Sequence, residues 1–167
     1  MELDSLYESI ARLRDRGAVA DTYTGTGEAD DPDGGVLSDF MEYVCEYHAR
    51  NRPDWLEAFY QVLTWQFETF HEGAEGYYED LYGESGEEKQ EKTADFLKKQ
   101  GYLELEAQFR RGMLLCGSGE TSEKTAAARE IREWMWSNRA CVWSFCLKIL
   151  EQHRQDWPEP EERKSDV

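Results

Sequence analysis

The sequence predicts an all-α fold, with a single compact helical domain of about six to seven helices and a long helix near its C-terminal end. Three observations support this class. Apolar residues recur at spacings of three and four through most of the 167-residue chain. Glycines and capping residues separate these segments, and the alternation typical of strands is scarce. With 40% hydrophobic and 13% aromatic residues, the chain can bury a core without disulfides or metals.

The first 35 residues predict one helix and one loop. Apolar side chains at helical spacing predict an amphipathic helix over residues 2–16. They are Leu3, Leu6, Tyr7, Ile10 and Leu13. Gly17 can end this helix in a left-handed conformation. Residues 17–35 are rich in Gly, Asp and Thr, so they predict a loop.

Residues 36–49 predict a second helix with an acidic face. Asp39, Glu42 and Glu46 recur at spacings of 3 and 4, on a different face from the apolar residues. No Lys or Arg occurs between residues 17 and 49, whereas eight Asp and Glu do. We therefore assign these three acids to an acidic partner-binding surface.

Residues 54–70 predict the central core helix. Six residues between positions 55 and 70 are polar, and four of them recur at spacings of 4, 3 and 4: Glu57, Gln61, Thr64 and Glu68. This spacing forms one narrow polar line down a helix. A helix with so thin a polar line must be covered on most sides. After it, Gly73 and Gly76 flank a short piece that leads into an apolar cluster containing Tyr77 and Tyr78.

Two further helices are predicted between residues 85 and 116. Ser85 and Glu88 have the spacing of a capping box, which predicts a helix starting at Ser85 and running to about residue 100. Lys98 and Lys99 suit its last turn, and Gly101 suits its C-terminal cap. Residues 102–116 carry apolar side chains at helical spacing and predict the next helix.

The longest predicted element starts at residue 121 or 122 and continues to about residue 156. Its predicted buried stripe comprises Ile131, Trp134, Met135, Asn138, Cys141, Val142, Phe145, Cys146 and Ile149. Trp136 faces a different side, so an exposed Trp136 would indicate a dimer or partner surface. The predicted domain covers residues 1–157, and residues 158–167 form a charged, flexible tail.

The chain is strongly acidic, and its acidity is unevenly distributed. The formal net charge is −17, and residues 1–120 account for −16, with 27 acidic and 11 basic residues. Residues 121–167 are nearly balanced, with nine acidic and eight basic residues. Binding to nucleic acid needs Lys and Arg to neutralise phosphates, so nucleic acid and anionic membranes should repel this chain. We therefore expect a basic partner.

The sequence gives no indication of secretion or membrane insertion. Its start lacks the basic and apolar regions of a signal peptide, and no window approaches the length of about 20 apolar residues that spans a membrane. The four cysteines, Cys45, Cys116, Cys141 and Cys146, form no C-x-x-C pair. They are predicted to be small buried side chains in a reducing compartment, so we expect a cytoplasmic protein.

The candidate functional residues are carboxylates between residues 68 and 91, a stretch with nine acids and one base. Four of them recur at spacings of 4, 3 and 4: Glu68, Glu72, Glu75 and Glu79. They would share one face, roughly 5–6 Å apart along the axis, if a helix continued through Gly73 and Gly76. The series continues with Asp80, Glu84, Glu87, Glu88 and Glu91.

Such an array imitates a nucleic-acid backbone coarsely, because phosphates on one DNA strand are about 3.4 Å apart along the axis. A protein that binds DNA through Lys and Arg could accept these carboxylates instead. The alternative is an ordinary solvated face that keeps the protein soluble.

The remaining residues predict no catalytic, cofactor or metal site. Cys45 and His48 lie three residues apart but lack a second pair of ligands. His71 and Glu72 begin like the zinc motif H-E-x-x-H, but Glu75 occupies the place of the second His. The carboxylates are too evenly spread to single out an acid–base pair.

Residues 53–116 resemble the bacterial DNA-mimic-protein domain family, long described as a domain of unknown function. The resemblance rests on residues 67–78, FETFHEGAEGYY, and on residues 93–101, TADFLKKQG. The family pattern has an acid-containing helix, an Asn-Gly-Gly-aromatic turn, an aromatic pair and a short helix that ends in Gly. Here the Asn-Gly-Gly is not intact, since Ala74 and Glu75 replace part of it. The resemblance implies an all-α fold, and the family's named member is an acidic dimer that presents carboxylates in place of DNA phosphates.

These observations favour an acidic, non-enzymatic binding protein that covers the basic nucleic-acid-binding surface of a partner protein. A second hypothesis is a protein–protein interaction module, for instance an immunity or adaptor protein, whose charge serves steering and solubility. A carboxylate-dependent hydrolase is less favoured. The sequence leaves a homodimer open.

Overall fold

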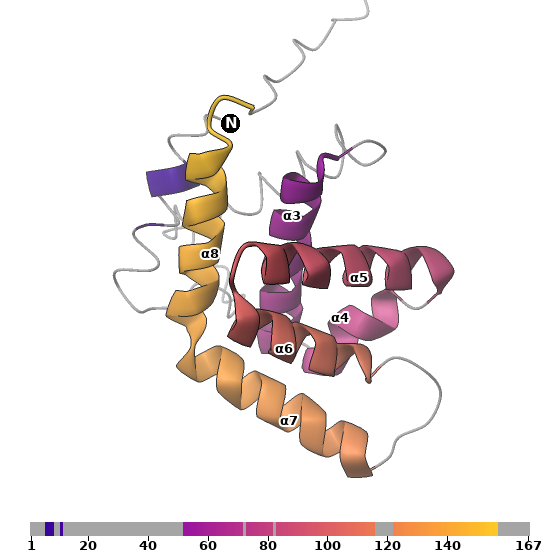
Figure 1. The fold of residues 1–167 in the computed structure, drawn as a ribbon. Helices are drawn as coiled ribbons and strands as arrows, with labels where there is room; N and C mark the ends of the chain where they lie inside the picture. The colour runs from indigo at the N-terminus through magenta and orange to yellow at the C-terminus, as the bar shows by residue number, and fades with distance from the viewer. Residues whose placement is uncertain are drawn as a thin grey trace, which may run out of the picture.

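The computed structural model describes residues 6–8, 11, 52–71, 73–81, 83–115 and 122–156. These residues form six labelled helices, α3 to α8, preceded by a helical fragment at residues 6–8 and 11, and they contain no strand (Figure 1). The predicted all-α class is confirmed. The predictions for residues 17–49 and for the tail at residues 158–167 lie outside the described residues. The described helices share one hydrophobic core that includes Leu6.

Helix α3 (Asp54–His71) is the centre of this core, as predicted. It packs against α4, α5, α7 and α8, and Figure 1 shows α5 and α6 in front of it with α8 along one side. Its aromatic side chains are mostly buried, and the exposed exception among its large apolar residues is Phe67. The surrounding helices thus cover nearly the whole circumference of α3, which explains why its sequence shows so few polar residues.

The narrow polar line of α3 is itself partly buried. Gln61 is only 2% exposed and accepts a hydrogen bond from the Tyr77 hydroxyl at 2.6 Å. The Gln61 amide donates to Glu57 at 2.5 Å, and Arg52 donates to the other oxygen of Glu57 at 3.1 Å. Because a buried polar group needs a partner, this chain of side chains links α3 to α4.

Helix α4 (Ala74–Asp80) is a separate short helix. Gly73 precedes it with a φ of +101°, a conformation that favours glycine. Tyr77 and Tyr78 are buried, as the predicted aromatic cluster requires, with their rings edge to face at 4.8 Å. The Tyr78 hydroxyl donates to the Phe109 carbonyl at 2.8 Å, which attaches α4 to α6 (Leu103–Met113).

Helix α5 covers Glu84–Lys99 and therefore begins before Ser85. The predicted capping box of Ser85 and Glu88 is wrong. Gly83, with a φ of +127°, is the residue before the helix, and no side chain caps the start. Ser85 therefore lies inside the first turn. The predicted end is confirmed, because Gly101 has a φ of +83°. Hydrogen bonds from Gly101 N to Lys98 O and from Tyr102 N to Leu97 O, both 3.0 Å, complete a Schellman motif.

The single long C-terminal helix is also a wrong prediction. The chain forms α7 (Ser122–Ser137) and α8 (Arg139–Gln152), separated at Asn138. The Asn138 side-chain amide donates to the Trp134 carbonyl at 3.0 Å, and its backbone N–H donates to the same oxygen at 2.8 Å. Asn side chains compete in this way with regular helix hydrogen bonds. The break lets α7 cover α4 and α6 while α8 packs along α3 (Figure 1).

Candidate functional site

The acidic residues predicted as a partner surface are only partly placed by the structure. Asp39, Glu42, Glu46 and Glu72 lie outside the described residues, as does the side chain of Glu84. The remaining members are Glu68, Glu75, Glu79, Asp80, Glu87, Glu88 and Glu91.

These acids do not form one continuous helical face. Glu68 is half-buried on α3, whereas Glu75 and Glu79 are exposed on α4. The positive φ of Gly73 separates the two helices, while Gly76 is accommodated inside α4. The single acidic face that the sequence spacing would allow is therefore excluded, because the helix is interrupted at Gly73.

Four exposed acids lie on α4 and in the first turn of α5, and we call them the α4–α5 acidic surface: Glu75, Glu79, Asp80 and Glu87. The Glu75 carboxylate lies beside Gly73, at the start of α4. The end of α4 and the first turn of α5 are in close contact, since a Cβ on Gly86 would lie 1.7 Å from the Leu81 carbonyl oxygen. Within the described part of the chain, none of these four carboxylates has a hydrogen bond or an ion pair.

Helix stability accounts for some of these acids and not for others. A carboxylate in the first turn of a helix interacts favourably with the helix dipole, which applies to Glu75 and Glu87. Glu79 and Asp80 lie at the opposite end of α4, whose last turn contains no basic residue. The dipole opposes negative charge there, so these two acids have no explanation in the stability of their own helix.

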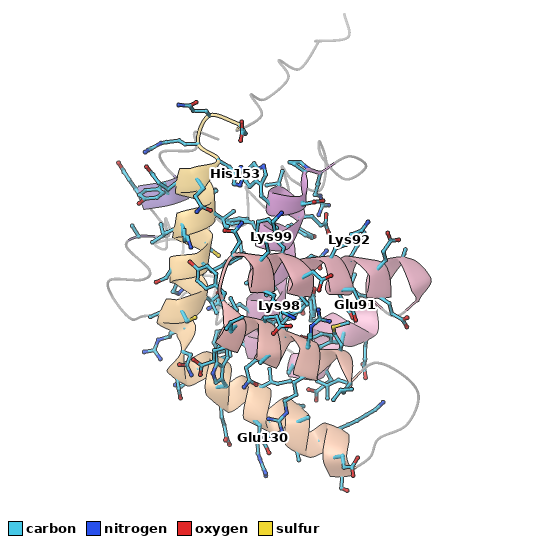
Figure 2. The ribbon with its side chains drawn as sticks, in the orientation of Figure 1. Glu91, Lys92, Lys98, Lys99, Glu130 and His153 are labelled. Carbon is cyan, nitrogen blue, oxygen red and sulfur yellow. The ribbon has the colours of Figure 1, made fainter. Side chains whose placement is uncertain are left out.

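The later acids of the series are neutralised by bases. Glu88 pairs with Lys92 at 2.7 Å, and this hydrogen bond and charge lower the pKa of Glu88 and raise that of Lys92. Glu91 accepts a hydrogen bond from Arg110 at 2.5 Å. Figure 2 labels Glu91 and Lys92 along α5. The predicted acidic array is thus shorter than its sequence suggests.

Arg110 of α6 is the residue that balances the second half of α5. Its guanidinium binds three carboxylates, Glu91 at 2.5 Å, Asp95 at 2.6 Å and Glu106 at 2.5 Å. The hydrogen bonds that Arg110 donates to Glu91 and Glu106 raise the pKa of Arg110. Arg110 therefore joins α5 to α6 and offsets the charge of these acids, although Glu91 and Asp95 stay exposed.

The described cysteine and histidine residues have contacts that suggest structural roles. Burial raises the pKa of the Cys146 thiol and, to a smaller extent, that of Cys141, and both are free cysteines. The His153 ring stacks on Trp55 at 4.7 Å and lies 3.2 Å from the Asp156 carboxylate. Cys45, Cys116, His48 and the side chain of His71 lie outside the described residues. Within the described ranges, no group of three or more His, Cys, Asp or Glu could hold a metal ion.

A hollow on the surface lies beside α8. It is lined by Tyr7, Ser144, Leu147, Lys148, Glu151 and Gln152. Its two charged residues have opposite signs, and Lys148 also lies 5.0 Å from the Tyr102 ring centre. The hollow therefore presents no cluster of like charges or nucleophiles.

A basic and aromatic line on α7 was not anticipated from the sequence. Arg129, Arg132 and Trp136 are all exposed, Trp136 to 45%. Their spacings of 3 and 4 place them on one side of the helix, and this spacing is visible in the sequence. Trp136 is exposed, which is the condition stated for it, and the dimer or partner surface that its exposure would indicate stays a prediction.

No described helix is both long and apolar enough to cross a membrane. Neither a protein-family model, nor a curated protein, nor a solved structure matches the chain.

Proposed function

We propose that this protein is a non-enzymatic binding protein that presents the α4–α5 acidic surface to the basic nucleic-acid-binding surface of a partner protein. The observation that carries the proposal is the contrast between two sets of acids. Glu75, Glu79, Asp80 and Glu87 are exposed without an ion pair in the described residues. Glu88 and Glu91, farther along α5, are paired with bases.

The spacing of these carboxylates supports a partner that binds phosphates. Glu75 and Glu79 are four residues apart on α4, which separates them by about 6 Å along the helix axis. Two successive steps along one DNA strand cover about 7 Å. Lys and Arg side chains that bind phosphates two steps apart could therefore reach Glu75 and Glu79 on α4. The resemblance to the DNA-mimic-protein domain family favours the same interpretation.

The position of Glu79 and Asp80 adds a second argument. Both oppose the dipole of α4, an effect that costs roughly 0.3–1 kcal/mol for each charge at an exposed helix end. Charges that destabilise their own helix are more readily retained in a protein where they bind a partner. A basic surface would lower the energy of both carboxylates.

The test is a pull-down from cell lysate with the full chain as bait, at low and at high salt. Proteins that bind nucleic acid should be retained at low salt, released at high salt and displaced by added DNA, because both ligands would compete for the same Lys and Arg. The test variant replaces Glu75, Glu79, Asp80 and Glu87 with Lys, and should lose at least about tenfold in affinity for the retained protein.

A charge-matched control separates the surface from the net charge. It replaces Glu159, Glu161, Glu162 and Asp166 with Lys, which changes the net charge by the same amount near the end of the chain. This control should bind as the wild type does. Equal loss in both variants would show that net charge, not the α4–α5 acidic surface, governs binding.

The exposed Trp136 supports an alternative, a protein–protein interaction module that uses an aromatic anchor. Trp and Arg are the residues most often found at binding hot spots, and the Arg139 guanidinium lies 5.7 Å from the Trp136 ring centre. This alternative predicts a partner that remains bound at high salt and is lost in Trp136→Ala. The α4–α5 variant would then bind normally.

A further inference from the structure

The outer side of α6 carries an apolar line that no described helix covers. Leu103 and Leu114 are 61% and 72% exposed, more than any other large apolar side chain in the described residues. With the exposed Ala107 and the partly exposed Arg110, they recur at spacings of 4, 3 and 4, which place all four on one side of the helix. Single exposed leucines are common, whereas an aligned set forms a continuous strip. We call Leu103, Ala107 and Leu114 the α6 apolar line.

The helices around this line carry little net charge. Helix α6 packs between α5 and α7 (Figure 1). The three helices together contain ten acids and nine bases, whereas the whole chain has a net charge of −17. Arg110 offsets carboxylates of α5, and Arg111 pairs with Glu130 of α7, which Figure 2 labels. A second copy of this acidic chain therefore meets much less repulsion here than its total charge would cause.

The α6 apolar line is also complementary to itself. Its spacings of 4, 3 and 4 are the same when read in either direction along the helix. When two α6 helices are placed antiparallel about a two-fold axis at the centre of the line, Leu103 of one copy meets Leu114 of the other. Ala107 then meets the aliphatic part of Arg110, and its small side chain lets the helices approach closely. We propose that α6 binds α6 of a second copy of this chain in this antiparallel arrangement.

The charges of α6 fit the same arrangement. Its first turn contains two acids and its last turn two bases, so an antiparallel copy places the acidic start of one helix beside the basic end of the other. Glu104 accepts a hydrogen bond from the Trp134 indole at 3.1 Å, and Arg111 pairs with Glu130. Both therefore lie on the side of α6 that faces α7. In the two-fold pair, Glu104 comes within about 3 Å of Arg111 of the second copy, measured along the helix axis.

Glu104 and Arg111 have the capacity to form this contact. Glu104 is exposed and forms no ion pair among the described residues. The Arg111 side chain is 39% exposed, and a guanidinium has five N–H donors, more than its pair with Glu130 uses. Two Glu104–Arg111 pairs would therefore flank the apolar contact, one at each end.

The acids of α4 lie on the other side of α6. The Tyr78 ring of α4 meets Gly112, and its hydroxyl donates to the Phe109 carbonyl, both on the buried side of α6. The two-fold contact therefore leaves α4 uncovered in both copies. This inference goes beyond the proposed function and does not depend on it.

The contact is small, and salt should strengthen it. An 11-residue helix is about 16 Å long, so the interface lies at the lower end of the range for specific complexes. We expect a dissociation constant on the order of 10–100 μM. Salt screens the repulsion between two chains of net charge −17, whereas the apolar contact does not depend on charge. Binding to a basic partner has the opposite salt dependence.

The first measurement is the molar mass of the purified full chain by sedimentation, from about 5 to 500 μM protein. At about 0.15 M salt the mass should rise from the monomer value of 19.5 kDa towards twice that value, and less protein should be needed at about 0.5 M salt. A monomer under all these conditions would overturn the proposal. Growth beyond the dimer would also overturn it, because a two-fold contact closes on itself.

A second experiment removes the apolar line. Leu103→Ser combined with Leu114→Ser should weaken association at least about tenfold. Both side chains are more than half exposed, so circular dichroism should show an unchanged fold. The matched control is Trp136→Ser, which removes an exposed apolar side chain from α7 and should associate as the wild type does. The reverse result would overturn the assignment to α6.

Charge reversal tests the pairing of Glu104 with Arg111. At about 0.15 M salt, Glu104→Arg alone and Arg111→Glu alone should each associate about tenfold more weakly, because like charges then meet across the contact. An equimolar mixture of the two variants should regain association, since each copy supplies the charge that the other lacks. A mixture no stronger than either variant, with both folded by circular dichroism, would overturn this pairing.

Cross-linking tests the antiparallel direction. In this arrangement two copies of position 103 lie about 16 Å apart, too far for a disulfide, whereas position 103 of one copy adjoins position 114 of the other. Under mild oxidation neither Leu103→Cys nor Leu114→Cys should cross-link alone, and their mixture should, above the background of the wild type. Cross-linking of Leu103→Cys with itself would overturn the direction. The variants at positions 103 and 114 keep all four carboxylates of the α4–α5 acidic surface and should bind normally in the pull-down, so the two proposals fail independently.

Discussion

The ring of Tyr78 lies directly over Gly112, so closely that a Cβ on Gly112 would be 2.1 Å from the tyrosine ring. The contact holds α4 against α6, and the Tyr78 hydroxyl adds a hydrogen bond to the Phe109 carbonyl at 2.8 Å. The packing contact that positions α4 and its acidic residues therefore leaves no room for a side chain at position 112. The placement of the candidate site depends on this packing.

Gly112→Ala should lower the free energy of unfolding by about 2–3 kcal/mol, because the added methyl group overpacks a buried contact. Denaturant unfolding measures the change. The matched control is Gly101→Ala, where nothing lies within 4 Å of the added Cβ and the φ of +83° is the source of strain. That control should cost about 1 kcal/mol.

A double-mutant cycle identifies the cause of the Gly112→Ala effect. Tyr78→Leu removes the ring that the new methyl group would meet, so the double variant should cost clearly less than the sum of the two single variants. Additive costs would show that the ring of Tyr78 is not the obstacle.

Tyr77→Phe should destabilise the protein by about 1–3 kcal/mol, since it leaves the buried Gln61 oxygen without its donor at 2.6 Å. The comparison variant is Thr64→Val on the same helix. Its hydroxyl bonds to the Tyr60 carbonyl at 2.8 Å in a partly exposed position, so its loss should cost less. Thermal unfolding of both variants gives the ranking, and an equal effect would contradict the role assigned to the buried chain from Tyr77 to Arg52.

Arg110→Ala should destabilise the protein by about 1–2 kcal/mol, because three carboxylates lose a shared guanidinium and then repel one another. Raising the salt concentration should recover part of this loss. Arg110→Lys should retain less than half of the stabilisation, since an ammonium group cannot match the geometry of three separate carboxylates. Urea unfolding at low and high salt measures both effects, and a salt-independent loss would indicate packing instead of charge.

The sequence predicted the fold best where a periodic pattern was interrupted by a residue with a clear conformational preference. Helix α3 and the end of α5 at Gly101 are examples. The start of α5 was missed because the capping-box spacing of Ser85 and Glu88 concealed the role of Gly83, whose positive φ is a property of the backbone. The break at Asn138 was missed because α7 and α8 each bury one helix face. The spacing of apolar residues therefore continues across the break.

The sequence predicted which acids the candidate site contains, but not which of them form ion pairs. The sequence identified the acids of residues 68–91 as unusual. It could not show that Arg110, 19 residues beyond Glu91 and 15 beyond Asp95, would neutralise the second half of α5. That pairing depends on the turn at Gly101, which brings α6 back along α5 (Figure 1). Long-range geometry, not spacing, thus determines which carboxylates remain available.

Cys146 should make stability fall as the pH rises through the alkaline range. Burial raises its pKa in the folded protein above the usual thiol value of 9.0. The stabilisation is therefore fully present below pH 9.0 and is lost progressively as the unfolded thiol ionises above it. Cys146→Ala should flatten the alkaline part of the stability curve measured by urea unfolding between about pH 8 and 10.

Labelling the native wild type with iodoacetamide provides the control, because a buried, protonated Cys146 should react only on unfolding while the half-buried Cys141 reacts sooner. Rapid native labelling of Cys146 would contradict both expectations.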